Sequence, residues 1–203
     1  MSSSRLWKID VASIVDSMNS RLLKLFHLAA VGLPLLILIA GLSGCQTPAK
    51  DTPQRAIVRR VDLQKFMGDW YVIAHIPTFI ETQAYNAVES YQLDPDGTIA
   101  TTFKFNEGGF DGRLKTYKPR GFIYNRETNA EWRMQFVWPF KAAYLITSLS
   151  TDYQTTIIGV PDRKYVWIMA RTKTIPDKLY AEMVKSLEKS GHDISKLRRV
   201  PQR

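Results

Sequence analysis

Residues 130–138 read AEWRMQFVW, a stretch in which apolar and polar side chains alternate almost without a break. In an extended strand, successive side chains point to opposite faces of a sheet. One face therefore gathers four large apolar side chains: Trp132, Met134, Phe136 and Trp138. The other face carries Glu131, Arg133 and Gln135. This segment predicts a β-strand with one aromatic, buried face and one solvent-exposed face.

Seven further segments show the same period of two: Asp69–Ile76, Asn86–Leu93, Thr98–Phe105, Leu114–Tyr124, Ala142–Leu149, Tyr153–Val160 and Lys164–Arg171. Short polar turns separate them, for example Asp94-Pro95-Asp96-Gly97. Eight short, regularly spaced strands indicate an antiparallel sandwich or barrel. We expect a short helical turn over residues 62–67 before the first strand, and a last edge strand at Leu197–Val200.

One longer helix is predicted after the strands. Thr174 is the expected N-cap, and Leu179, Met183 and Leu187 recur at the spacing of one helix face. Gly191 is expected to end the helix. A single apolar stripe predicts that this helix packs with one face against the outside of the sheet.

Three other predicted strands also group side chains on one face. These groups are Ala87, Glu89, Tyr91 and Leu93; Ile99, Thr101, Phe103 and Phe105; and Tyr165, Trp167, Met169 and Arg171. A barrel of about eight strands either fills its interior with side chains or leaves room for one small ligand. The pattern is compatible with both.

Glu89 is the only carboxylate among these grouped residues. In a dry core it would need a cationic partner or a raised pKa, whereas in a partly wet cavity it could hold the polar group of a ligand. A one-residue register slip would instead place it outside. The candidate ligand contacts are Glu89, Tyr91, Phe103, Trp132, Met134, Phe136, Trp138, Tyr144 and Trp167.

The N-terminal region has the pattern of a secretory signal. Arg21 and Lys24 precede the apolar run Leu28–Leu42, and residues 25–49 contain no Asp, Glu, Lys or Arg. The sequence Leu42-Ser43-Gly44-Cys45 resembles the lipobox of bacterial lipoproteins, which implies lipid attachment to Cys45. The alternatives are a transmembrane anchor, although Gly and Pro interrupt the run, or a chance buried cysteine.

The chain therefore divides into three predicted parts. Residues 1–44 are expected to be a signal peptide, residues 45–60 the lipidated N-terminus with a flexible tether, and residues 61–203 one folded domain. Met18 is the candidate true start, because the mixed charges of residues 1–17 do not fit a signal peptide. Gln46, rather than Asp, follows the cysteine, which by resemblance to lipoprotein sorting implies delivery to the outer membrane.

Composition excludes several classes of protein. The chain has 203 residues and a formal net charge of +9; residues 45–203 contain 24 basic and 17 acidic side chains, a net charge of +7. One cysteine excludes an internal disulfide framework and a cysteine-based zinc site, and three histidines offer little for a metal centre. The basic excess fits acidic lipids and anionic surfaces, or simply favours solubility. No nucleic-acid-binding module is recognisable.

Three motifs occur in order: Gly68-Asp69-Trp70 at the first strand, Thr151-Asp152-Tyr153 between the sixth and seventh strands, and Arg171 at the end of the eighth. With the helix that follows, they resemble the lipocalins, and within them the bacterial outer-membrane lipocalins. The resemblance covers Val61 to Val200, and both residues 161–172 and 138–140 look like the bacterial subgroup. It implies an all-β fold, an eight-stranded antiparallel up-and-down β-barrel with one C-terminal α-helix packed outside.

The resemblance also implies roles for the motifs. In the family, the motif arginine lies across the motif tryptophan, so Arg171 would stack on Trp70 at the closed end of the barrel. The structural positions are then Gly68, Trp70, Thr151, Asp152, Tyr153 and Arg171. The implied function is to bind, store or transport fatty acids, lysophospholipids or phospholipids for envelope maintenance at the outer membrane, without a cofactor or metal.

The open end of such a barrel is the expected entrance. The segments 77–81 and 138–140 carry bulky apolar residues there, which either cap the core or form an apolar portal or a partner-binding patch. His75 is expected near this rim as a polar residue rather than a metal ligand. Because open rims can pair, a homodimer is a further hypothesis.

Other function classes have less support. Some lipocalins are isomerases that use a cysteine in the lumen, but no cysteine falls within the predicted barrel. The sequence contains no Gly-x-Ser-x-Gly elbow, no HExxH motif and no convincing acid–base pair, so a non-catalytic protein is predicted. The alternatives are a binder of haem, a pigment or a terpenoid, and a structural lipoprotein with a filled core.

Overall fold

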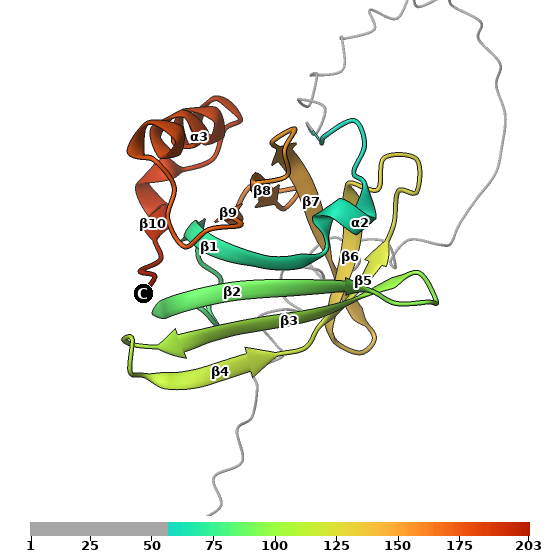
Figure 1. The fold of residues 1–203 in the computed structure, drawn as a ribbon, viewed down its shortest axis with the longest axis horizontal. Helices are drawn as coiled ribbons and strands as arrows, with labels where there is room; N and C mark the ends of the chain where they lie inside the picture. Colours follow the sequence, from blue (N-terminus) through green and yellow to red (C-terminus); the bar gives the residue numbers. More distant parts are fainter. Residues whose placement is uncertain (1–56) are drawn as a thin grey trace, which may run out of the picture. The chain divides into compact units, whose positions relative to one another are not determined.

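The computed structural model describes residues 57–203, shown in colour in Figure 1. The predicted signal peptide, Cys45 and most of the tether lie outside these residues. The elements in chain order are α2 (Leu63–Phe66), β1 (Gly68–Ile76), β2 (Ala84–Leu93), β3 (Thr98–Glu107), β4 (Arg113–Tyr117), β5 (Arg120–Ile123), β6 (Glu131–Val137), β7 (Phe140–Leu149), β8 (Thr155–Gly159), β9 (Val166–Ala170), α3 (Asp177–Lys189), a 3₁₀ turn (Ile194–Lys196) and β10 (Arg198–Arg199).

The strands form one closed antiparallel barrel, which confirms the predicted fold. Consecutive strands from β1 to β9 pair with one another, except that β4 and β5 both pair with β3 instead of with each other. Strand β9 pairs back with β1, which closes the sheet. The registers Tyr71↔Ala170 and His75↔Trp167 fix this closure. With β4 and β5 counted as one interrupted strand, the barrel has eight strands; β10 adds a short edge to β1.

The prediction of one continuous strand over Leu114–Tyr124 is wrong. The segment forms two strands, β4 and β5, which pair with different parts of β3. Lys118 and Pro119 lie between them, and proline has no N–H to donate to the sheet. The break lets β5 turn away from β4 to pair with β6.

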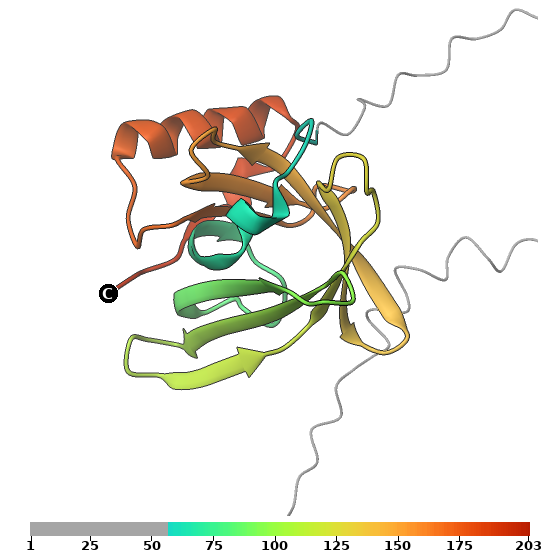
Figure 2. The same cartoon turned by 45° about the vertical axis from the view of Figure 1, so that its right-hand side comes forward.

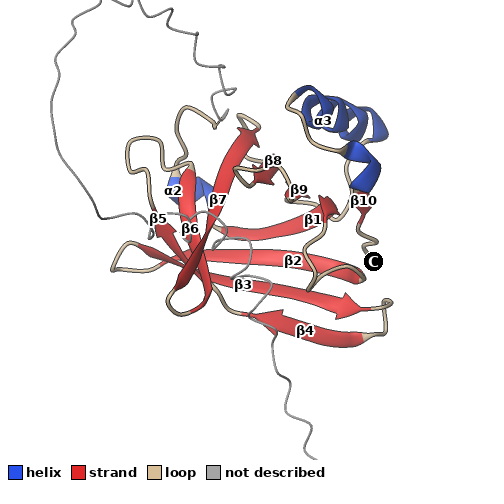
Figure 3. Ribbon diagram, turned by 180° about the vertical axis from the view of Figure 1, so that it is seen from behind, coloured by secondary structure: helices blue, strands red, loops and turns tan. Residues whose placement is uncertain are grey.

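Helix α3 packs against the outside of the barrel, beside β8 and β9 in Figure 2, and Figure 3 shows it in blue next to the red sheet. Met183 and Leu187 are the buried residues of its apolar stripe, as predicted. The predicted N-cap is wrong: the helix begins at Asp177, and Pro176 occupies the cap position without a side-chain hydrogen bond. The fixed φ of proline favours starting the helix there.

Two apolar clusters lie on the two sides of the barrel wall. The inner cluster fills the space between the strands and contains Trp70, Tyr91, Trp132 and Ile146. The outer cluster lies between strands β1, β8 and β9 and helix α3. A register shift between Val72 and Ala74 lets β1 serve both clusters: Val72 faces inward, whereas Ala74 packs outward.

The closed end of the barrel is held by Arg171. Its guanidinium carbon lies 3.8 Å from the centre of the Trp70 ring, which is fully buried. Its nitrogens donate hydrogen bonds of 2.8–3.4 Å to four backbone carbonyls: Lys65, Phe66, Asp69 and Tyr153. The arginine therefore connects α2, β1 and the turn between β7 and β8.

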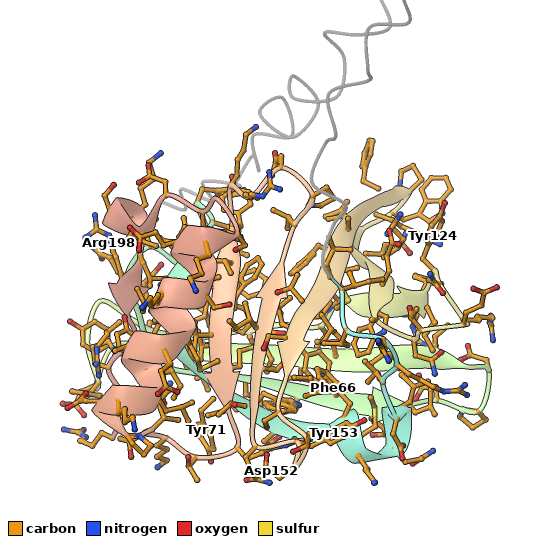
Figure 4. All side chains as sticks on the ribbon, turned by 90° about the horizontal axis from the view of Figure 1, so that it is seen from above. Phe66, Tyr71, Tyr124, Asp152, Tyr153 and Arg198 are labelled. Carbon is orange, nitrogen blue, oxygen red and sulfur yellow. The ribbon has the colours of Figure 1, made fainter. Side chains whose placement is uncertain are left out.

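The other motif residues surround this contact, and Figure 4 shows Phe66, Asp152 and Tyr153 at the same end of the barrel. Gly68 has a φ of +92°, and a Cβ there would lie 3.4 Å from the Arg171 guanidinium. The Tyr153 hydroxyl accepts a hydrogen bond from the Asp62 N–H, which begins α2. Asp152 accepts hydrogen bonds from Ser150 and Gln154 within its turn, and Thr151 lies exposed beside it.

Within residues 57–203, no helix combines the length and the apolar character needed to cross a membrane.

Candidate functional site

Glu89 points into the barrel, because its neighbours on the same face of β2 are buried: Ala87 is 1% exposed and Tyr91 is 3% exposed. Its Cα partners are Trp70 on β1 and Phe103 on β3, and both of these side chains belong to the inner cluster. The register slip that would have placed Glu89 outside does not occur. A carboxylate therefore lies on the inner face of the barrel, level with Trp70.

Two tyrosines connect Glu89 to the opposite wall. The Tyr91 hydroxyl donates to the Glu89 carboxylate, and the Tyr91 and Tyr144 hydroxyl oxygens lie 2.5 Å apart. Burial raises the pKa of Glu89 from 4.5 to about 7; the Tyr91 hydrogen bond opposes this rise, and the charge of Glu81 adds to it. Burial also raises the pKa of both tyrosines, so they remain donors. This series of hydrogen bonds, Glu89–Tyr91–Tyr144, crosses the lumen from β2 to β7.

A second carboxylate, Glu81, reaches into the barrel from the loop between β1 and β2 and is only 2% exposed. Its Oε1 accepts hydrogen bonds of 3.1 and 3.0 Å from the backbone N–H and hydroxyl of Thr78. The indole N–H of Trp167 donates to it at 3.2–3.3 Å. The segment 77–81 was predicted to present bulky apolar residues at the entrance; Glu81 is its one acidic residue, and its side chain is instead buried.

His75 lies beside Glu81 and is 2% exposed, so it is buried rather than a polar residue of the rim. Its Nδ1 is 3.5 Å from Glu81 Oε2 and has no hydrogen-bond partner among the described residues. The shift in β1 turns His75 inward, opposite Trp167. No group of three His, Cys, Asp or Glu side chains within residues 57–203 could hold a metal ion.

The base of the lumen is aromatic. The rings of Trp132 and Tyr144 stack at 5.4 Å, and Tyr91 meets Trp132 edge-on at 5.7 Å. Phe66 closes this group from below, 5.5 Å from Trp132 and 5.0 Å from Trp70. These contacts fill the closed end, so any ligand would lie between this aromatic base and the open end.

Above this base the interior retains accessible space. Glu89 and Trp167 face inward yet are only partly buried. Ala142 shares the inner face of β7 with Tyr144 and is exposed. Trp70 and Ile146, by contrast, are completely buried. Accessible surface on the inner faces is therefore confined to residues above the aromatic base.

The structure brings together seven of the nine predicted ligand contacts. Five belong to the inner cluster, Glu89 bonds to one of these, and Trp167 packs against the cluster. Phe136 and Trp138 were predicted to face the interior, and this prediction is wrong: their side chains are 51% and 82% exposed. A register shift between Met134 and Val137 ends the regular alternation before these two residues.

Phe136 and Trp138 instead form an exposed apolar rim with Phe79 and Phe140, which are 63% and 37% exposed. Phe79 lies in the loop after β1, and the other three lie at the β6–β7 hairpin. Both connections are at the open end, opposite the Arg171 contact. We refer to Phe79, Phe136, Trp138 and Phe140 as the aromatic rim.

The chain has recognisable relatives. A family model described as a lipocalin-like domain matches residues 61–202. Temperature-induced lipocalin-1 of Arabidopsis thaliana is 31% identical over 163 residues, covering 72% of this chain and 82% of that protein. Outer membrane lipoprotein Blc of Escherichia coli (strain K12) is 28% identical over 179 residues, covering 86% and 95%.

Solved structures agree with the fold. Insecticyanin from the tobacco hornworm Manduca sexta superposes with a TM-score of 0.57 at 20% identity, covering 73% of this chain and 84% of that chain. The family match spans the whole barrel and the helix after it, and the closed barrel and the Arg171–Trp70 contact agree with it. The chain therefore belongs to the lipocalin family.

Proposed function

We propose that this lipocalin is a non-catalytic lipid-binding protein whose barrel holds the hydrocarbon chain of a fatty acid, lysophospholipid or phospholipid. The observation that carries the proposal is the apolar, aromatic inner face of the barrel, on which Glu89 and Ala142 face inward but keep accessible surface. Apolar surface removed from water there stabilises a bound chain by about 25 cal/mol per Å². The names of the bacterial relatives, which are outer membrane lipoproteins, support a lipid ligand near the envelope.

The direct test is to purify residues 57–203, extract the protein with organic solvent and identify released molecules by mass spectrometry. We expect a lipid, recovered chemically unchanged after incubation, and displacement of a fluorescent fatty acid from the barrel. A released haem, pigment or terpenoid would replace the lipid assignment. Turnover of a lipid ester that depends on Glu89 would indicate an enzyme instead.

A larger side chain at Ala142, on the inner face near the open end, should weaken binding of a fatty acid. Ala142→Trp places a large ring on the inner face of β7 at an exposed position. We expect about a tenfold or greater loss of affinity for the fluorescent fatty acid, because the ring occupies space needed by the chain. The matched control is Ala143→Trp, one residue along on the opposite face, which should bind normally. Equal affinity in both variants would contradict a ligand in this lumen.

We also propose that the protein is anchored to the outer membrane through a lipid on Cys45, after removal of residues 1–44. The relatives that are outer membrane lipoproteins support this. The protein isolated from membranes of a Gram-negative host should give an N-terminal peptide that starts at Cys45 and carries acyl mass. Peptides from residues 1–44 in the mature protein would rule the proposal out.

A further inference from the structure

The C-terminal segment closes a seam in the barrel wall between β1 and β2. The direct pairing of these two strands ends at Tyr71↔Val88. Beyond that point, β10 pairs with the edge of β1 that β2 has left, as Figure 1 shows near the C-terminus. Across the seam, the Asn86 N–H of β2 donates to the Pro201 carbonyl at 2.8 Å. Residues 198–201 therefore take the place of direct pairing between the two strands.

A cavity of about 270 Å³, the seam cavity, lies at the open end of this seam, where the loops after β1 and β3 meet the C-terminal segment. Its polar lining residues are His75, Thr82, Gln83, Tyr85, Arg198 and Arg199. No Asp or Glu of residues 57–203 is among its lining residues. Ala84 also lines it and belongs to the inner apolar cluster, so the cavity borders the barrel interior. Figure 4 shows Arg198 away from Asp152 and Tyr153 at the closed end.

Arg198 is the cation of this cavity that has no partner. Its Cα partner on β1 is His75, so the two side chains emerge on the same face of the sheet. The Arg198 side chain makes no hydrogen bond, ion pair or ring contact with another residue of the described chain. The Arg199 guanidinium, by contrast, pairs with Asp177 at 3.0 Å and lies 3.8 Å from the centre of the Tyr180 ring. Arg198 therefore supplies a positive charge that no carboxylate of the chain offsets.

His75 adds a second group to the cavity wall. It is 2% exposed, and its Nδ1 has no hydrogen-bond partner among the described residues. This nitrogen lies 3.5 Å from Glu81 Oε2, in a carboxylate that already accepts hydrogen bonds from Thr78 and Trp167. An anion in the seam cavity would favour the protonated ring, which donates one N–H towards Glu81 and the other to the anion.

These groups suit a phosphate. Guanidinium and imidazolium N–H groups bind phosphate oxygens through charge-assisted hydrogen bonds. Thr82, Gln83 and Tyr85 add neutral polar side chains that can share the remaining phosphate oxygens. Because the cavity borders the apolar interior at Ala84, it suits a phosphate that carries a hydrocarbon chain better than a free ion.

Building on the lipid-binding function proposed above, we infer that the seam cavity binds the phosphate group of a single-chain phosphate amphiphile. Arg198 and His75 hold the phosphate oxygens, and the hydrocarbon chain passes Ala84 into the barrel. The site therefore selects a phosphate amphiphile over a neutral amphiphile of equal chain length.

The test compares decyl phosphate, decanol and inorganic phosphate on the intact protein at pH 7.5, with the decyl compounds kept below the concentrations at which they aggregate. Isothermal titration calorimetry measures the affinities. We expect decyl phosphate to bind about tenfold tighter than decanol, because only the phosphate can use Arg198 and His75. Inorganic phosphate should bind at least about tenfold more weakly than decyl phosphate, because it lacks the apolar chain.

One variant assigns the preference to the seam cavity. Arg198→Gln should lower the affinity for decyl phosphate about tenfold, to that of decanol, and leave the decanol affinity unchanged. The matched control is Arg126→Gln, which removes the same charge from an exposed position in the loop between β5 and β6, on the α2 side of the barrel. It should keep the preference. Equal losses in the two variants would indicate general charge attraction and overturn the inference.

A second measurement locates the phosphate without any change at Arg198. The chain has three histidines, His27, His75 and His192. In NMR spectra of the imidazole rings, decyl phosphate should shift the resonances of His75, identified by their loss in His75→Asn, and decanol should shift them less. Resonances of His75 that do not move at saturating decyl phosphate would place the phosphate elsewhere.

The outcomes separate the two proposals. If neither decyl compound binds and no lipid is extracted, the lipid-binding function itself fails. If both decyl compounds bind equally well, or if the phosphate preference survives Arg198→Gln, lipid binding stands and the inference about the seam cavity is wrong. If inorganic phosphate binds as tightly as decyl phosphate, the cavity is a site for the free ion and the assignment to an amphiphile is wrong.

Discussion

Replacing Arg171 with alanine is expected to lower the Tm by about 5–15 °C, a loss of about 2–4 kcal/mol. The change removes the stacking on Trp70 at 3.8 Å and four hydrogen bonds to backbone carbonyls. The carbonyls then lose charged donors, and α2 loses a link to the rest of the closed end. Thermal unfolding followed by circular dichroism measures the effect.

Arg171→Lys is the informative companion variant. Its single ammonium keeps the charge but cannot reach all four carbonyls, so its Tm should fall between those of wild type and Arg171→Ala. Ligand class should be unchanged in both variants, since the contact lies at the opposite end from the entrance. A Tm within about 2 °C of wild type for Arg171→Ala would contradict the structural role.

Glu89→Gln is expected to stabilise the protein by about 3 kcal/mol at pH 8 and to leave stability at pH 4 unchanged. Burial raises the pKa of Glu89 from 4.5 to about 7 in the folded barrel. Between these values the unfolded chain releases a proton that the folded protein still holds, so wild-type stability falls as pH rises from 4.5 to 7. Glutamine removes this cost and can still accept the Tyr91 hydrogen bond.

Urea unfolding at several pH values tests this expectation. The difference in unfolding free energy between the variant and wild type should grow from pH 4.5 to pH 7 and then level off. Glu188→Gln should follow the wild-type curve, because its side chain is exposed. A difference that does not change with pH would show that Glu89 titrates normally in the folded state.

Most of the fold could be predicted from the sequence, because the period of two marks each strand and the helix stripe marks α3. The departures have local causes. Pro119 interrupts one predicted strand, and Pro176 starts α3 two residues after the predicted cap. The backbone constraints of proline determine both boundaries. The spacing of apolar residues carries no information about these constraints.

The site was predicted where it lies on regular strands and missed where it does not. Alternation placed Glu89 and Tyr91 on the inner face, and the pairing of β6 with β7 brought Tyr144 to them. Glu81 was missed because an inward-folding loop has no periodic pattern. Phe136 was wrongly predicted to face inward, because the register shift between Met134 and Val137 cannot be recognised from the sequence pattern.

The pairing of β1 with β9 also has a consequence for how the chain reaches its native state. It joins segments roughly one hundred residues apart, such as Tyr71 and Ala170, so closure depends on strongly non-local contacts. A chain made from its N-terminus cannot complete this pairing until β9 has emerged. Until then β1 has an unpaired edge, and the aromatic inner faces stay open to other chains, so high contact order makes slow folding and self-association the main hazards of its biogenesis.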